Sequence, residues 1–429
     1  MPSFRDQLLI IFSGLLYLLA LPPVGWGPLV FVCFVPILSV AQRVSLAGAA
    51  WLGFLFGLVA YICIPIALIS QGVVVAVCGL LTGAGIFSLV LITTWLLARW
   101  VLSGSTWLAF PAAYALIQFT SESFLAVPLS LSVTFPFEAF GANSIFSYAG
   151  SYGVDYLICA ENGLLLACFN NLTKKTGWGA ALVPVIIVIV LAPLVTASNS
   201  SSPPLNIVTI DTAIDYQQVE LRNFELESRS NIERQLDQLT KEVALQKNAD
   251  LIVWPENING APNQQSFKRR GVFKALAEKI DYNLLIGSNY YGGNGKRYNV
   301  ANYIVNGEFT VQSEKQHRVP IVESDVEPGL NQSIPIKEHN IAATICFDIA
   351  FSKTIKQSVR NGAEGIVTIS NDSLFGLTSL TYLHIRYAQL RAIENGRNIL
   401  FFSNTGPSVL IDEKGSIKSG YIHTERARV

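Results

Sequence analysis

Apolar residues dominate the first 200 positions, in long runs that few charges interrupt. A bilayer core of about 30 Å needs roughly 20 consecutive apolar residues in a helix, with about 17 to 25 tolerated. Five runs meet this length: 47–69, 73–98, 106–128, 144–169 and 178–197. Two shorter runs, 7–21 and 28–42, precede them and fit either two short spans or one re-entrant hairpin. The pattern predicts an α-helical membrane bundle of about seven transmembrane helices.

The pattern changes after position 198, where serine, asparagine and proline form a short polar connector. Beyond it, short apolar runs typical of strands alternate with longer segments of helical spacing. We expect strands at 205–210, 249–256, 283–288, 298–305, 308–315, 340–346, 365–370 and 398–403, and a hairpin near 408–418. We expect helices at 217–248, 272–280, 352–361 and 379–395. This alternation predicts a layered α/β domain.

Composition separates the same two parts. The chain is 51% hydrophobic and 14% charged, whereas an ordinary soluble protein has roughly 25% charged residues. Residues 1–200 hold ten charged residues, or 5% of that segment, and the remaining 229 residues hold 50, or about 22%. We therefore expect a membrane domain at 1–198, a linker at 199–204 and a soluble domain at 205–429. Thirty basic residues balance thirty acidic ones, so no positive excess is available to bind a nucleic acid.

The positive charges of the membrane domain predict its orientation. If the N-terminus is cytoplasmic and every run spans, each lysine and arginine of this domain lies on the cytoplasmic side, as the positive-inside rule requires. These residues are Arg5, Arg43, Arg99, Lys174 and Lys175. Seven spans then place the residues after about 200 outside the cytoplasmic membrane.

Few ionisable residues lie within the predicted spans. Asp155 and Glu161 are the exceptions, and two groups do not make the chain of titratable residues that an ion or proton pathway needs. A transporter is therefore disfavoured. Two glycine pairs have the spacing that lets membrane helices approach closely, Gly53 with Gly57 and Gly79 with Gly83.

The six cysteines are unevenly distributed. Five lie in or beside apolar runs, where a thiol behaves as a small hydrophobic group: Cys33, Cys63, Cys78, Cys159 and Cys168. Cys346 is the only cysteine of the soluble part, so it has no disulfide partner there, although the predicted location favours disulfides. It ends the strand at 340–346 just before a turn. At such an elbow a nucleophile projects from the sheet edge, and the next amide can donate to an oxyanion. A buried structural cysteine fits the local sequence equally well.

A cysteine nucleophile needs a base, because a thiol is mostly protonated at neutral pH. Glu256 ends the strand at 249–256, and strand ends gather at one edge of a sheet, which makes Glu256 a candidate base. Lys315 is a candidate positive charge for a developing oxyanion. Spacing alone fits a surface glutamate and a surface lysine as well. A protease-like pair of Cys346 with His317 or His384 is the competing hypothesis.

Five motifs in order resemble the nitrilase superfamily. They are Trp254-Pro255-Glu256, Lys315 within Lys-Gln-His-Arg-Val-Pro, Cys346 within Ile-Cys-Phe-Asp, the segment 368–376, and the segment 391–397. A nitrilase-like domain behind a multi-span membrane domain is similar to the apolipoprotein N-acyltransferases of bacterial inner membranes, and the resemblance covers nearly the whole chain. It implies an αββα sandwich whose catalytic residues lie on the periplasmic side.

The resemblance also implies a two-step acyl transfer. Glu256 would be the general base that takes the Cys346 proton, and Cys346 would attack an ester of a phospholipid, typically phosphatidylethanolamine, to give a thioester acyl-enzyme. Lys315 and the backbone amide of Phe347 would stabilise the oxyanion. The α-amino group of a diacylglyceryl-modified cysteine, at the N-terminus of a lipoprotein, would then accept the acyl chain. No metal or organic cofactor is implied.

Two supporting carboxylates follow from the same resemblance, with some departures from the family pattern. Glu323 stands eight residues after Lys315, where the family has an active-site glutamate. Asp348 replaces a glutamate two residues after the nucleophile, and Phe347 replaces a tyrosine. Only 23 positions separate Glu323 from Cys346, which is short for the family's lid loop.

The chain ends at Val429 without the final membrane helix of the family, so we expect a catalytic domain truncated at its C-terminus. The short segment before the nucleophile motivates one alternative function, a membrane-tethered nitrilase-type amidase that hydrolyses a small amide. A non-enzymatic scaffold is a further alternative, and it predicts that Glu256, Lys315 and Cys346 lie far apart.

Overall fold

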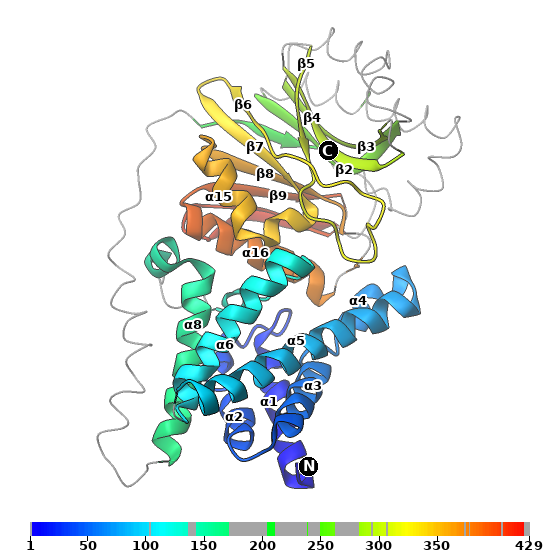
Figure 1. Cartoon of the computed structure of the whole chain (residues 1–429). Coiled ribbons are helices and arrows are strands. Elements are labelled where there is room, and N and C mark those ends of the chain that lie inside the picture. Colours follow the sequence, from blue (N-terminus) through cyan, green and yellow to red (C-terminus); the bar gives the residue numbers. More distant parts are fainter. Residues whose placement is uncertain are drawn as a thin grey trace. The chain divides into compact units, whose positions relative to one another are not determined.

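A computed structural model (Figure 1) describes residues 2–102, 104–135, 143–170, 204–210, 238, 249–261, 283–292, 295–305, 308–372, 375–376, 378–404 and 406–423. The chain divides into two compact units. The first comprises Met1–Thr196 with Thr378–Arg386, and the second comprises Ala197–Leu377 with Tyr387–Val429.

The first unit is helical. Its α-helices are α1 (Phe4–Ala20), α2 (Val35–Ala41), α3 (Leu46–Ala60), α4 (Ile64–Leu68), α5 (Val73–Trp100), α6 (Thr106–Thr120) and α8 (Asn143–Asn170). Shorter turns are η1 (Gly27–Phe31), η2 (Ile69–Gln71), η3 (Ser121–Leu125) and η4 (Leu131–Thr134). The part of the chain that the structure describes thus holds a helix for each apolar run from 47–69 to 144–169, and α1 for the run 7–21. The run 178–197 lies outside the described residues.

Among the described helices, α5 alone is long and apolar enough to cross a membrane by itself. The predicted run 47–69 is instead α3 followed by α4 and η2, bent by 56°, and this pair qualifies together as one broken span. Pro65 stands in the first turn of α4. Proline disfavours a helical residue before it and lacks a backbone donor, which is consistent with the bend between α3 and α4. The run 28–42 is similarly divided into η1 and α2. Seven spans therefore stay a prediction.

The glycine pairs do permit close helix packing. A Cβ atom on Gly57 would lie 2.5 Å from the Cα of Ala84, and one on Gly53 would lie 2.4 Å from the carbonyl oxygen of Phe87. The backbones of α3 and α5 therefore approach too closely for any larger residue at these two positions.

Asp155 lies inside α8 and is fully buried. Its carboxylate accepts hydrogen bonds from the Gln118 side chain (2.8 Å) and from the Ser132 backbone amide (2.7 Å). Asp155 thereby joins α6, α8 and η4, which is a structural role that the sequence pattern did not reveal.

The second unit contains two sheets. The five-stranded sheet has the order β1 (Ile207–Thr209), β2 (Leu251–Ala261), β3 (Asn283–Tyr291), β4 (Arg297–Val305) and β5 (Glu308–Glu314). The six-stranded sheet has the order β11 (Ile417–His423), β10 (Gly406–Ile411), β9 (Asn398–Ser403), β8 (Gly365–Ser370), β7 (His339–Ile345) and β6 (Ser333–Ile336). Strands β7, β8 and β9 run parallel, so their carboxyl ends meet at one edge.

The two sheets pack face to face across one apolar core. Side chains from both sheets build it, including Val253 and Tyr303 from one sheet and Ala343, Ile345 and Val367 from the other. Helices α15 (Ser352–Arg360) and α16 (Ser379–Asn395) follow β7 and β8 in the chain, and neither contributes to this core, so they lie outside the pair of sheets (Figure 1). This arrangement supports the nitrilase-like α/β sandwich. The helices predicted at 217–248 and 272–280 lie outside the described residues.

Several strand boundaries differ from the prediction. β2 continues to Ala261, past the predicted end at Glu256, through an irregular pairing with β3 between Trp254 and Asn259. β6 was not predicted, because the segment Ser333–Ile336 is short and contains Pro335, which is tolerated at a sheet edge. β7 ends at Ile345, so Cys346 is the first residue after the strand.

Candidate active site

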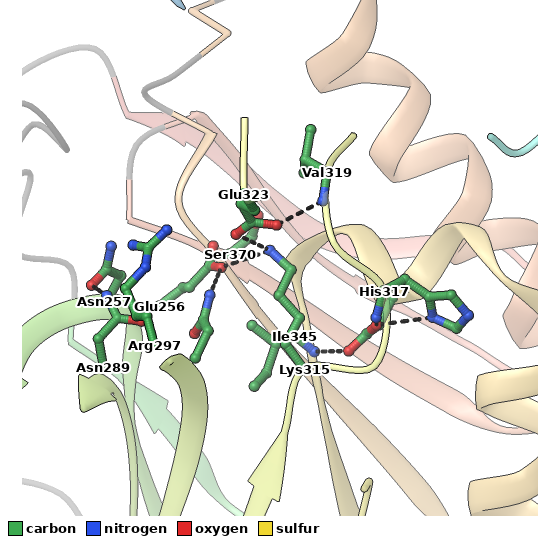
Figure 2. Close-up of polar contacts among 12 residues, drawn as sticks. Glu256, Asn257, Asn289, Arg297, Lys315, His317, Val319, Glu323, Ile345 and Ser370 are labelled. Atoms are coloured by element: carbon green, nitrogen blue, oxygen red, sulfur yellow. Dashed lines mark hydrogen bonds and ion pairs between the residues drawn. The ribbon is translucent and has the colours of Figure 1, made fainter. Parts of the chain in front are cut away.

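Glu256, Lys315 and Glu323 form a buried charge network (Figure 2). The Lys315 Nζ atom lies 3.3 Å from Glu256 Oε1 and 2.8 Å from Glu323 Oε1. Their side chains are at most 12% exposed, with Lys315 at 1%. Glu256 comes from β2, and Lys315 directly follows β5 in the same sheet. The structure thus brings these three predicted site residues together, and it excludes the interpretation of Glu256 and Lys315 as surface residues.

Asn299 belongs to the same network and was not predicted. Its Nδ2 atom donates to Glu256 Oε1 at 2.7 Å, and its backbone carbonyl accepts from the Lys315 amide at 2.9 Å. Asn299 lies in β4, between the strands that supply Glu256 and Lys315. Asn299 lies near the start of β4, which also contains Arg297 and Asn302, so its sequence context did not single it out.

Cys346 occupies a strained turn directly after β7. Its φ angle is 50°, in the left-handed region that non-glycine residues rarely adopt, and a 3-10 helix, η6 (Cys346–Ala350), begins there. The side chain is buried, with 4% exposure. The predicted elbow is therefore present, and it directs the chain away from the sheet at the nucleophile position.

Asp348 stabilises this elbow and holds it against the segment after Lys315. Its carboxylate accepts hydrogen bonds from the backbone amides of Gln316 (3.1 Å), His317 (2.8 Å) and Ile345 (3.4 Å). Asp348 itself is fully buried. The shorter aspartate can therefore hold the Lys315 segment close to the elbow of Cys346.

His317 packs as a structural residue. Its Nδ1 atom lies 3.1 Å from Asp348 Oδ1, and its ring stacks on Phe351 with centroids 3.7 Å apart. These contacts leave the Cys346–His317 pair without support, because the ring is already committed to Asp348 and Phe351. His384 lies on α16, in the part of that helix that belongs to the first unit, and its pairing with Cys346 stays a hypothesis. Phe347 is half-buried, and its ring meets Phe351 edge to face at 5.2 Å.

Glu323 is held by the segment that follows Lys315. Its second carboxylate oxygen, Oε2, accepts from the Val319 amide at 2.8 Å. Two residues further on, Asp325 forms an ion pair with Arg297 of β4 at 2.9 Å, and Val326 forms an isolated bridge with Arg297. The segment is therefore tied to the five-stranded sheet on both sides of Glu323, which fixes that carboxylate beside Lys315.

Burial and neighbouring charges shift the pKa values of Glu256, Cys346 and Lys315. Burial raises the pKa of Glu256, and the nearby Lys315 ammonium opposes this only in part. Burial, reinforced by the Glu256 carboxylate, raises the pKa of the Cys346 thiol well above its usual range, although Lys315 acts in the opposite direction. Burial lowers the pKa of Lys315, but the acidic groups around it, including the Glu256 and Glu323 carboxylates, outweigh burial and keep the pKa well above its usual range. At neutral pH the site therefore holds a neutral thiol and a lysine ammonium.

This combination suits general-base-assisted attack by a thiol. A thiol of raised pKa does not ionise beforehand, so its proton has to move to a base as the sulfur attacks. Glu256, whose raised pKa makes it a stronger base than an exposed glutamate, is the carboxylate that acts most strongly on Cys346. Lys315 adds a fixed positive charge in a buried site, where such a charge stabilises an oxyanion most effectively.

Comparison with known proteins divides the chain in the same two parts. Residues 212–427, half of the chain, match the family model of the carbon-nitrogen hydrolases. Residues 13–164 match the model of the apolipoprotein N-acyltransferase N-terminal domain.

Individual relatives agree with these matches. An apolipoprotein N-acyltransferase from Geobacter metallireducens is 25% identical, over 97% of this chain and 88% of that protein. One from Shewanella oneidensis is 25% identical, over 63% of this chain and 57% of that protein. Among solved structures, Nit3 of Saccharomyces cerevisiae, a member of branch 10 of the nitrilase superfamily, is 19% identical. It covers 54% of this chain and 91% of its own, with a TM-score of 0.44.

Proposed function

Because the chain belongs to the carbon-nitrogen hydrolase family and has the two-part organisation of the apolipoprotein N-acyltransferases, we propose that it transfers an acyl chain from a phospholipid to a lipoprotein. The acceptor is the α-amino group of the N-terminal diacylglyceryl cysteine. The chain is a multi-pass protein of a bacterial inner membrane, with a cytoplasmic N-terminus and a periplasmic catalytic unit. The observation that supports this function best is the buried network of Glu256, Lys315 and Glu323, whose charges shift the pKa of Cys346. This network lies in the part of the chain that follows an apolar helical unit.

In the first half-reaction, Cys346 Sγ attacks the ester carbonyl of the phospholipid while Glu256 takes the thiol proton. Lys315 and the Phe347 backbone amide stabilise the tetrahedral oxyanion. When this intermediate collapses, the ester C–O bond breaks and Glu256 returns the proton to the departing lysophospholipid oxygen. A thioester acyl-enzyme remains, and Glu256 is again deprotonated for the second half-reaction.

In the second half-reaction, the acceptor amine attacks the thioester carbonyl, the C–S bond breaks, and an amide forms. Glu323 keeps Lys315 in place through both steps, because the two groups are 2.8 Å apart. Asp348 keeps the Lys315 segment against the elbow. Both substrates are lipid-anchored, so a catalytic unit tethered to the membrane searches a surface for them.

The test is direct detection of the intermediate. We expect the purified full chain, incubated with a fluorescent phospholipid in mixed micelles, to form a covalent acyl adduct that neutral hydroxylamine removes. Cys346→Ala should form no adduct. A diacylglyceryl peptide with a free α-amino group should then discharge the adduct and become fluorescent.

Two outcomes would overturn the proposal. A folded wild-type protein that forms no more adduct than Cys346→Ala does not use a thioester. Discharge to water, with ammonia released from simple amides and no acylated peptide, would instead identify a membrane-tethered amidase or hydrolase.

A further inference from the structure

Asp372 lies beside the nucleophile, and the two-step mechanism above gives it no role. A carboxylate oxygen of Asp372 lies within 4.8 Å of Cys346 Sγ. Topology explains this proximity. Cys346 follows β7 and Asp372 follows β8, these strands are parallel, and Ile345 pairs with Ile369 at their ends. Asp372 is 1% exposed, so it lies within the protein interior together with the thiol.

Hydrogen bonds fix the position of Asp372. The Ser370 hydroxyl donates to its Oδ1 atom at 2.7 Å, and its own backbone amide donates to the Ser403 hydroxyl at 3.1 Å. Its carbonyl accepts from the Phe375 amide at 3.0 Å. The carboxylate is therefore held at the carboxyl edge of the parallel strands, where its charge acts on Cys346.

A proton count distinguishes the two half-reactions. In the first, the thiol loses one proton and the departing lysophospholipid oxygen gains one, so a single base that returns its proton is sufficient. In the second, an acceptor that arrives as an ammonium ion loses two protons when it becomes an amide. One of these returns to Cys346 sulfur, and the other needs a second proton acceptor beside the thioester. An α-amino group has a pKa of about 7.7 to 8.0, so it is mostly protonated at neutral pH.

The charges around Cys346 also favour a cationic acceptor. The charged side chains that act on the thiol include three carboxylates, Glu256, Glu323 and Asp372, and one ammonium, Lys315. Lys315 is already paired with Glu256 and Glu323. A negative site attracts an ammonium ion, and the acyl-enzyme adds no charge of its own.

We propose that Asp372 is a catalytic residue of the second half-reaction. Its carboxylate binds the acceptor's α-ammonium group and takes the surplus proton before the acceptor nitrogen attacks the thioester. This inference rests on the proposed acyl-transfer function. Glu256 takes and returns the proton of the Cys346 sulfur, and Asp372 passes the surplus proton to solvent after the amide product leaves.

The experiment measures the two half-reactions separately in Asp372→Asn, using the full-length protein in mixed micelles. We expect the acyl adduct to form from fluorescent phospholipid at close to the wild-type rate. Transfer from the isolated adduct to a diacylglyceryl peptide should be at least about 100-fold slower, the lower range of what a positioned base contributes. Discharge by hydroxylamine should be unchanged, because hydroxylamine is neutral at pH 7 and brings no surplus proton.

Asp250→Asn is the matched control. Asp250 is also buried in this unit, at 7% exposure, but it binds the Asn206 amide and Lys337 at the start of β2. It should leave both half-reactions unchanged. Asp372→Glu, which keeps a carboxylate, should recover part of the transfer rate.

The outcomes separate the two proposals. If wild-type protein forms no adduct, the acyl-transfer function fails. If wild-type protein acylates the peptide and Asp372→Asn does so equally fast, the function stands and the role of Asp372 is wrong. Equal losses in adduct formation, peptide transfer and hydroxylamine discharge would also overturn it, because they would show that Asp372 only maintains the fold around Cys346.

Discussion

Replacement of Lys315 by methionine tests the charge balance of the site. Methionine has a similar volume and no charge, so Lys315→Met leaves the carboxylates of Glu256 and Glu323 buried together. At an effective dielectric constant of about 20, the Nζ–oxygen distances of 2.8 and 3.3 Å correspond to about 6 and about 5 kcal/mol of attraction. The cost of burying the ammonium offsets much of this, and loss of one partner from a buried pair typically costs about 3 to 5 kcal/mol.

This cost should depend on pH. Without Lys315, the pKa of the Glu256 and Glu323 pair rises above the value of about 4.3 for an unfolded glutamate. Below about pH 4 both carboxylates are protonated in the folded and unfolded states, and the penalty is absent. As pH rises, the folded state retains a proton that the unfolded state releases, so stability falls by about 1.4 kcal/mol per pH unit for each retained proton. Between pH 5 and 7 this amounts to about 3 kcal/mol.

Thermal unfolding followed by tryptophan fluorescence measures the effect. Trp254 is fully buried, two residues before Glu256, and reports on this part of the sheet. For a unit of this size, about 3 kcal/mol lowers the midpoint by about 6 to 12 °C. We expect that drop at pH 7, relative to wild type, and a much smaller one at pH 5. Lys418→Met, which removes an exposed partner of the half-buried Asp412, should leave the midpoint close to that of wild type. Equal destabilisation of Lys315→Met at both pH values would refute the reasoning, because it would indicate lost packing rather than an uncompensated charge.

Two further predictions concern the base and the helix packing. Glu256→Gln should slow lysophospholipid release by at least about 100-fold without lowering the unfolding midpoint, because glutamine fills the same space without a buried charge; a normal burst of release would exclude Glu256 as the base. Gly57→Leu should sharply reduce the yield of folded protein, since its Cβ would lie 2.5 Å from the Cα of Ala84. Gly85→Leu is the control, because in the described part of the chain no atom outside its own helical turn lies within 4 Å of an added Cβ. Equal yields from both variants in detergent would contradict the close approach of α3 and α5.

The strands and helices of the second unit were largely predictable, because apolar alternation and turn residues act locally. The predicted bounds of β8, α16 and β9 agree with the structure at both ends. The failures have local causes as well. β6 is short and contains proline, and the run 47–69 breaks before Pro65 although its hydrophobicity is continuous. Long apolar runs indicate which segments avoid water, but they do not locate helix ends: the run 47–69 breaks near Pro65, whereas α6 continues through Pro111.

The site was predictable only in part. Cys346 could be recognised as an elbow from its strand, but the choice of Glu256 and Lys315 as its neighbours depended on resemblance to a family. Those residues come from the other sheet, and sequence patterns do not specify how two sheets face each other. Asn299 and Asp372 were not assigned for the same reason: each becomes meaningful only through a distance to a residue far away in the chain.

Because the site is divided between two sheets, the catalytic rate should depend on how closely these sheets pack against each other. The base and the lysine belong to one layer and the thiol to the other, and the shared apolar interior, together with hydrogen bonds such as those of Asp348, keeps them in register. Tyr303 crosses that interior, and its hydroxyl donates to the Ile341 carbonyl at 3.4 Å. A displacement of about 1 Å between reacting groups can reduce a rate about 100-fold. Core substitutions that only weaken the packing between the two sheets should therefore abolish activity under conditions in which the protein is still folded. Amide hydrogen exchange in β7 should become faster in the same variants.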